Sequence, residues 1–302
     1  MGAEIFMDFV QQYILNFPQS WQFKAGKVID AMVMEFARDH RSGLELIKSG
    51  IIFMINCVRW FLSSVPWVVI VLFVALLSWY LMKKWYVGAL YGAMLVFIGS
   101  CGLWNEMIET LSIVVMGVAV CVAFGFPLGV FLAVNPRANR IVRPILDTMQ
   151  TMPSWVYLVP AGLLFQVGMT PALIATATYA IVPMVRMTSH GLIYVDKEML
   201  EASYAFGSTK LQTLMKVQIP QAKPTIMAGV NQTIMMAMSM VVTCALIGAK
   251  GLGMEILIAT NRVEVGRALF PGICIVMLAI ILDRLTQVAV KRQDVLGEEA
   301  DG

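Results

Sequence analysis

Charged residues are scarce in this sequence. Asp, Glu, Lys and Arg make up 14% of its 302 residues, and apolar residues make up 59%. Soluble domains are typically about 25% charged and about 45–50% apolar. A chain this poor in charge cannot cover a surface that faces water, so the apolar excess must face lipid. The composition therefore argues against a soluble globular protein and predicts an all-α membrane protein.

Residues that hold metals or bind nucleotides are also scarce. The two histidines, His40 and His190, lie far apart, and the cysteines form no CxxC pair. A zinc or haem site is therefore not expected. The sequence contains no GxxxxGK[ST] loop and no HExxH motif, so this chain is neither an ATPase nor a zinc hydrolase of those classes. We expect no catalytic residue, metal or cofactor on the chain, and the net charge of +3 gives no reason to expect nucleic acid binding.

Long apolar segments occupy residues 65–290. Seven of them approach the length needed to cross about 30 Å of hydrocarbon: 66–82, 86–103, 110–134, 147–168, 171–189, 224–248 and 268–290. The fourth and fifth carry Thr, Gln and Pro, as expected of helices that line a polar cavity inside a bundle. We predict a membrane domain of about seven transmembrane helices.

Two of these segments contain glycines four residues apart. The pairs are Gly88 with Gly92 and Gly125 with Gly129. Small residues at this spacing allow two helices to approach closely. We interpret both pairs as packing positions.

The first 64 residues differ from the rest because their charges are numerous and balanced. Within them, residues 43–62 carry apolar residues at helical spacing but are interrupted by Lys48 and Arg59. This pattern predicts an amphipathic helix that lies in the membrane interface, within an N-terminal extracytoplasmic extension over 1–64. A tilted extra transmembrane helix is the alternative.

Basic residues in alternate loops predict the orientation of the chain. They cluster after the first, third, fifth and seventh segments: Lys83, Lys84, Arg137, Arg140, Arg143, Arg186, Lys197, Lys210, Lys216, Lys223, Lys291 and Arg292. Lys250, Arg262 and Arg267 oppose the trend. By the positive-inside rule the N-terminus is outside and the tail at 291–302 is cytoplasmic.

The loop after the fifth segment, residues 194–223, is long and polar for a link between two spans. Lys197–Phe206 is a good helix former, and Gly207 can break the helix at positive φ. Ser208 or Thr209 can cap a second helix that runs to about Gln218. We expect two prolines, Pro220 and Pro224, to close this helix–turn–helix before the sixth span.

This loop resembles the EAA motif with which permeases of ABC importers dock on their ATPases. The matching residues are Glu201, Ala202, Ser203, Gly207, Ile219 and Pro220. Ser203 stands where the motif has Ala, and Val217 and Ile219 stand where it has Ile and Leu. The resemblance implies that these residues couple the membrane domain, a type I ABC importer transmembrane domain, to a separate ATPase.

The stretch Lys216–Gly253 is similar to the glycine betaine/proline branch of these permeases. The resemblance implies a permease of the bacterial inner membrane that works with a second copy of itself, two cytoplasmic ATPase subunits that hold ATP and Mg, and an external solute-binding protein. It also implies substrates such as glycine betaine, choline or trimethylamine N-oxide, with surrounding lipid as a further partner.

Aromatic residues in the two weakest spans are candidates for the solute path. Trp155, Tyr157 and Tyr179 can attract a quaternary ammonium group by cation–π interaction. Trp155 and Tyr157 as interface anchors are the alternative. An ion-coupled secondary transporter is the other class of function. A proton relay would need carboxylates in mid-membrane, and the clearest charged pair, Asp283–Arg284, falls near the cytoplasmic end of its span.

Overall fold

The computed structural model describes residues 26–300, with side chains up to residue 288. None of these residues is in a strand. The helices are α2 (Gly26–Asp39), α3 (Arg41–Ser64), α4 (Trp67–Met82), α5 (Trp85–Ser100), α6 (Trp104–Val134), α7 (Pro136–Thr151), α8 (Trp155–Phe165), α9 (Met169–Ile193), α10 (Lys197–Ala205), α11 (Lys210–Thr213), η3 (Leu214–Gln218), α12 (Ile219–Cys244), η4 (Ala245–Ile247), α13 (Leu252–Asn261) and α14 (Val265–Ala300). The all-α prediction is confirmed.

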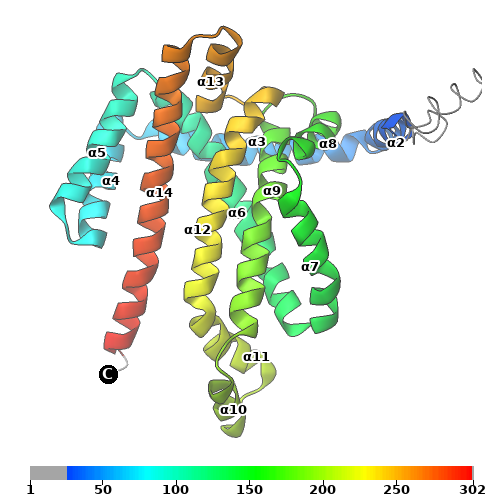
Figure 1. The fold of residues 1–302 in the computed structure, drawn as a ribbon, viewed down its shortest axis with the longest axis vertical. Helices are drawn as coiled ribbons and strands as arrows, with labels where there is room; N and C mark the ends of the chain where they lie inside the picture. The colour runs from blue at the N-terminus through cyan, green and yellow to red at the C-terminus, as the bar shows by residue number, and fades with distance from the viewer. Residues whose placement is uncertain (1–25, 301–302) are drawn as a thin grey trace, which may run out of the picture.

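The centre of the molecule is a bundle of α6, α9 and α12, which run side by side along its long axis (Figure 1). Glycines let these helices approach closely. A Cβ on Gly129 of α6 would lie 2.6 Å from the Cβ of Thr188, and one on Gly125 would lie 3.0 Å from Ile181 Cγ1, both on α9. A Cβ on Gly229 of α12 would lie 2.7 Å from Met187 Cβ. The packing role predicted for Gly125 and Gly129 is therefore confirmed.

Helices α4 and α5 form a hairpin beside the bundle, and α14 lies between this hairpin and α12 (Figure 1). Lys83 makes the tight turn with a φ of 55°. A Cβ on Gly88 would overlap the carbonyl oxygen of Ala75 on α4, so this pair of helices also packs through glycine.

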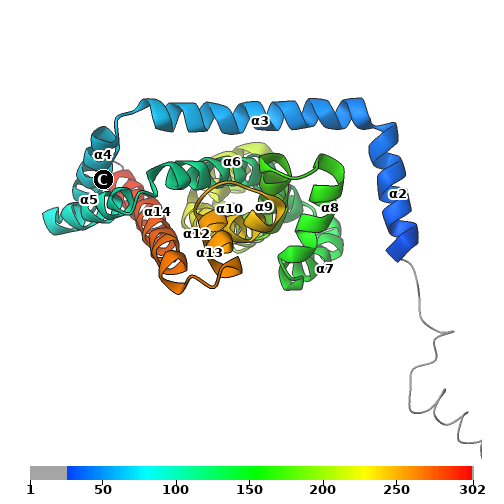
Figure 2. The same ribbon diagram turned by 90° about the horizontal axis from the view of Figure 1, so that it is seen from above.

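Helix α3 crosses the bundle instead of running along it (Figures 1 and 2). It contacts α6, α8 and α9 with one face, on which Ile55 is buried. Its other residues are largely exposed, among them Leu46, Phe53, Trp60 and Phe61. Arg59 Nη2 pairs with Glu109 Oε1 of α6 at 3.1 Å, which fixes the helix to the bundle. By length and composition alone α3 could also cross a membrane.

The predicted span at 147–168 is wrong. Its residues belong to two helices, the end of α7 and the whole of α8, with a break at residues 152–154. Met152 is extended, with a ψ of 136°, because a residue that precedes proline is disfavoured in the helical region, and Pro153 follows it. The arginine-rich segment before it is helix α7, which begins at an Asn135 cap and Pro136, where a loop was expected.

Two further boundaries differ from the sequence predictions. Helix α14 continues to Ala300, so most of the predicted tail at 291–302 is helical. Helix α13 fills the connection between the sixth and seventh segments, where no helix was expected. Five helices in the described part of the chain are long and apolar enough to cross a membrane, and the count of about seven spans stays a prediction.

Candidate functional site

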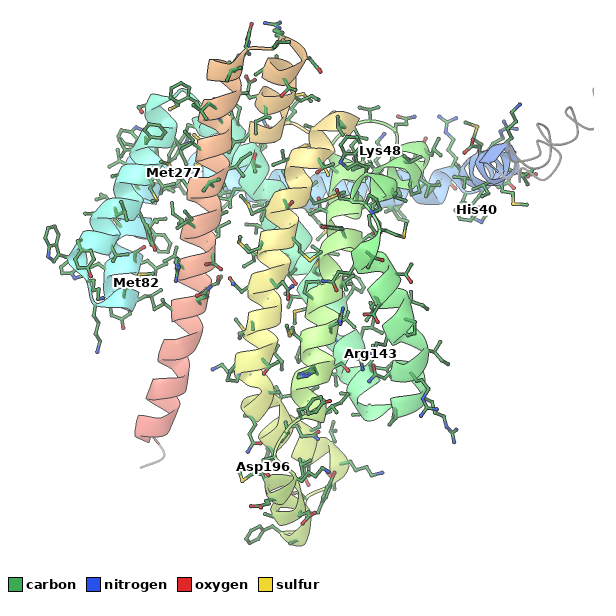
Figure 3. All side chains as sticks on the ribbon, viewed as in Figure 1. His40, Lys48, Met82, Arg143, Asp196 and Met277 are labelled. Carbon is green, nitrogen blue, oxygen red and sulfur yellow. The ribbon has the colours of Figure 1, made fainter. Side chains whose placement is uncertain are left out.

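The loop at 194–223 projects beyond the bundle at the end opposite α13 (Figures 1 and 3). Asp196, labelled in Figure 3, caps α10 by accepting a hydrogen bond from the backbone N–H of Glu198 at 2.9 Å. Glu198 in the first turn adds a carboxylate where the helix dipole favours it. The expected helix Lys197–Phe206 is confirmed, with its last helical residue at Ala205.

Gly207 ends α10 in the left-handed region, with a φ of 81°, as predicted. The N–H of Gly207 donates to Tyr204 O at 2.9 Å, and the N–H of Ser208 donates to Ser203 O at 3.1 Å. These two bonds form a Schellman motif, which requires a left-handed residue at the position of Gly207. Among the described residues, its two chain neighbours aside, no atom lies within 4 Å of a Cβ built there, so the need for glycine within this chain is conformational.

Thr209, one of the two expected caps, starts the second helix through a capping box with Gln212. The helix does not end near Gln218 as predicted. It continues through η3, a π-helical segment, into α12, and the N–H of Ile219 donates to Leu214 O. Pro220 has no N–H to donate, and in an α-helix its ring would clash with the carbonyl group four residues earlier. The wider π turn just before Pro220 avoids this clash, so the helix continues through the proline.

The six residues of the predicted docking motif divide into exposed and inward-facing positions. Glu201, Ala202, Gly207 and Pro220 are exposed, as a docking role requires. Ser203 is buried and its hydroxyl lies 3.0 Å from Thr213 Oγ1, which joins α10 to α11. Ile219 is half-buried and packs against a cluster that includes Leu192, Ala222 and Ile226.

Three exposed apolar side chains on the same loop were not predicted as docking residues from the sequence. Phe206 is 91% exposed, Leu211 is 68% exposed and Met215 is 59% exposed. Together with Glu201, Ala202 and Gly207 they form the surface that we call the docking tip. The sequence does place these large apolar residues in an otherwise polar loop. That pattern could have indicated a protein-binding surface, because exposed apolar patches mark such surfaces.

The aromatic residues proposed for a solute path are only partly brought together. The rings of Tyr157 and Tyr179 lie 5.8 Å apart between α8 and α9. The Tyr157 hydroxyl donates to the carbonyl oxygen of Met149 on α7. Trp155 is 64% exposed at the start of α8. The pair Tyr157–Tyr179 thus remains a candidate, and Trp155 has the exposure of an interface residue.

A cavity of about 550 Å³ lies between α7, α9 and α12. Arg186 lines it and is held by Asp147 Oδ1 at 3.0 Å and Gln150 Oε1 at 2.6 Å. Gln232 of α12 and Arg143 of α7, labelled in Figure 3, also line the cavity. The arrangement gives the bundle a polar hollow that can admit a small hydrophilic solute. The sequence reading assigned Arg186 only to the topology.

Comparison with known proteins identifies the family. Residues 125–295 match the family described as "Binding-protein-dependent transport system inner membrane component". The chain is 40% identical over 259 residues to the glycine betaine/proline betaine transport system permease protein ProW of Escherichia coli, which covers 86% of this chain and 72% of that protein. It is 42% identical over 242 residues to the glycine betaine/carnitine transport permease protein GbuB of Listeria monocytogenes, covering 79% and 86%.

A solved structure supports the same assignment. An inward-facing conformation of the MetNI methionine ABC transporter superposes with a TM-score of 0.52 and 25% identity, over 61% of this chain and 90% of that one. The fold is therefore that of a type I importer transmembrane domain. The chain belongs to the family of inner-membrane components of binding-protein-dependent ABC importers.

Proposed function

We propose that this chain is the permease subunit of an ATP-driven importer for a small methylated amine, such as glycine betaine, a related betaine, choline or trimethylamine N-oxide. The observation that carries the proposal is the docking tip. The docking tip lies at the end of the bundle, and its turn requires a left-handed residue at Gly207. It exposes the side chains of Phe206 and Leu211. A polar loop with exposed apolar side chains fits a surface that binds another protein.

The docking tip can transmit movement from an ATPase. The helix that starts at Lys210 continues to Ile247, so the tip and the core helix α12 form one element. Tilting of the tip by a bound ATPase would therefore tilt a helix that lines the polar cavity at Gln232. In this proposal ATP and Mg are held by two ATPase subunits, and a second copy of this chain completes the path.

The docking tip is placed in the cytoplasm by this proposal, and α2 and α3 at the outer face. The lysines of the loop, Lys197, Lys210 and Lys216, favour the cytoplasmic side. The crosswise course of α3 supports an interfacial position for it (Figure 2). An external solute-binding protein would deliver the solute at that face.

The substrate class rests on the relatives and on one feature of the bundle. Relatives named for glycine betaine, carnitine, choline and trimethylamine N-oxide transport match large parts of this chain. The rings of Tyr157 and Tyr179 offer faces that favour a quaternary ammonium group. Family membership disfavours the alternative of an ion-coupled secondary transporter.

Reconstitution tests the proposal. Proteoliposomes that hold this chain with its ATPase and the solute-binding protein should accumulate glycine betaine or choline only when ATP is present on the ATPase side. Liposomes that hold this chain alone should show no uptake driven by a proton or sodium gradient. Gradient-driven uptake by the chain alone would refute the proposal in favour of a secondary transporter.

A further inference from the structure

A second cavity, of about 190 Å³, lies far from the docking tip, between α3, the start of α6 and the turn from α8 to α9. Lys48, labelled in Figure 3, lies beside this turn. The side chains that matter here are Lys48, Arg59, Glu109, Thr170 and Lys250. They come from four separate parts of the chain, and neither the docking tip nor the cavity at Arg186 uses them.

Three basic side chains and one carboxylate are the charged residues that line this cavity. Lys48 Nζ donates to Gln166 Oε1 at 3.2 Å, and Arg59 pairs with Glu109 Oε1 at 3.1 Å. Lys250 adds a third positive charge, so three basic side chains face one carboxylate. The excess of positive charge attracts an anionic group.

Two buried polar atoms in the cavity lack a partner among the described residues. Thr170 is 2% exposed, and its hydroxyl makes no hydrogen bond there. Glu109 is 9% exposed; one of its oxygens binds Arg59, and Oε2 has no partner. Buried polar atoms without partners cost free energy, so a bound group that satisfies both would be stabilised.

The start of α9 adds the backbone N–H groups of Met169 and Thr170, whereas Pro171 has none. Met169, Thr170 and Pro171 line the cavity and form the first turn of this 25-residue helix. The N–H groups and the dipole at a helix N-terminus favour an oxyanion. The turn before it is firmly built, because the N–H of Gly168 donates to Ile247 O at 2.9 Å.

We propose that this cavity binds a phosphate group, either that of a phospholipid headgroup or free phosphate. The oxyanion would accept from Lys48, Lys250 and the Thr170 hydroxyl. A hydroxyl or ammonium group next to it, such as the O–H of monobasic phosphate or of a phosphoglycerol, would donate to Glu109 Oε2. A betaine has no such donor, because its nitrogen carries four carbon substituents and no hydrogen. The inference does not rest on the proposed function.

The test uses the purified full-length protein and inorganic phosphate as the probe. Phosphate replaces chloride at constant ionic strength, and the thermal unfolding midpoint is measured. We expect the midpoint to rise by about 3 °C near tenfold saturation. The double variant Lys48→Gln/Lys250→Gln and the near-isosteric Thr170→Val should lose most of this rise. Each variant is compared with its own midpoint in chloride, so a general loss of stability does not mimic the result.

A matched control and a second measurement complete the test. Lys27→Gln/Lys83→Gln removes two lysines outside the cavity and should keep the full rise. Native mass spectrometry of delipidated protein with phosphatidylglycerol then distinguishes the sources: lipid retained by the wild type and lost from Lys48→Gln/Lys250→Gln indicates a headgroup. Equal rises in the wild type and the cavity variants, or no rise and no retention, would overturn the proposal. So would an equal rise with glycine betaine that the same variants abolish.

Discussion

Asn231 Nδ2 on α12 donates to Asp283 Oδ1 on α14 at 2.6 Å. Gln287 Nε2 donates to the same oxygen at 2.8 Å, and Thr286 Oγ1 donates to Asn231 Oδ1 at 3.0 Å. Arg284 stands 3.9 Å from the other oxygen of Asp283, a loose contact. Side-chain amides therefore hold the carboxylate more closely than the arginine that the sequence pairs with it.

Removing either side of this bond should destabilise the protein. We expect Asn231→Ala and Asp283→Ala each to lower the thermal unfolding midpoint, and the double variant to lower it by less than the sum. The interaction free energy should be about 0.5–2 kcal/mol, because hydrogen bonds between membrane helices are modest. Thr260→Ala with Asp283→Ala serves as the distant control pair and should be additive. Additivity in the Asn231–Asp283 cycle would contradict the link.

Gly207→Val should uncouple ATP hydrolysis from the solute. A β-branched residue at a φ of 81° carries strain of about 1–3 kcal/mol, so the turn of the docking tip should rearrange. We expect normal membrane insertion but a loss on the order of tenfold in ATPase stimulation by the loaded solute-binding protein. Ser208→Val changes the next residue, which has no positive φ, and should have a smaller effect. Full stimulation of the ATPase in Gly207→Val would show that this turn is not needed for coupling.

Phe206→Ser should weaken the association with the ATPase. This side chain is 91% exposed, so its removal costs the isolated chain little, whereas a partner would lose an apolar contact. We expect about 1–3 kcal/mol weaker binding, measured by titrating the labelled ATPase onto the protein in nanodiscs. Val265→Ser replaces a 77% exposed apolar residue at the opposite end and should bind normally. Equal binding by both variants would argue against a docking contact at Phe206.

Gly129→Ala should destabilise the central bundle. The new Cβ would lie 2.6 Å from Thr188 Cβ and 2.8 Å from the carbonyl oxygen of Val185, and a backbone atom cannot move aside easily. The cost should be about 1–3 kcal/mol, seen as a lower unfolding midpoint. At Gly272, no other part of the described structure lies within 4 Å of a new Cβ beyond the adjacent turns of the same helix, so Gly272→Ala should be neutral or slightly stabilising.

Single cysteines test the orientation of the chain. In a background without the five natural cysteines, Lys27→Cys on α2 should react with a membrane-impermeant maleimide added to sealed cells, and Lys210→Cys in the docking tip should not. The expectation follows from the distribution of Lys and Arg and from the crosswise course of α3. Labelling of both from outside, or of neither, would mean that α3 crosses the membrane, and labelling of Lys210→Cys alone would mean that the orientation is reversed.

The helical class, the bundle glycines and the turn at Gly207 were accessible from the sequence because each has a local cause. Apolar runs, small residues four apart and a glycine between two helix formers are visible without tertiary information. The break at Pro153 was missed because the Thr, Gln and Pro of this segment were interpreted as cavity-lining positions within one helix, whereas Met152 before Pro153 is extended. The predicted helix end near Gln218 was wrong because a π turn accommodates Pro220 and the helix continues. A sequence pattern does not reveal such a turn.

The site divides in the same way. Glu201, Ala202 and Gly207 were found because motif spacing fixes them, and their exposure agrees with the proposed docking role. The inward position of Ser203 depends on Thr213, ten residues away on another helix. The cavities at Arg186 and at Thr170 join residues from distant parts of the chain, so no local pattern could have brought them together.

The unbroken helix from Lys210 to Ile247 has 38 residues and spans about 57 Å. Outside the π turn at Leu214–Gln218, each residue of this helix advances the side-chain direction by about 100°. The number of residues between the docking tip and Asn231 therefore sets the angle between two directions. One is the direction in which the docking tip faces, and the other is the direction in which the Asn231 side chain points toward α14. A single residue gained or lost in this interval would turn one face away from its partner, whereas a change of about seven residues, close to two full turns, would restore the phase while altering the reach. The length of this segment is therefore constrained by its contacts at both ends.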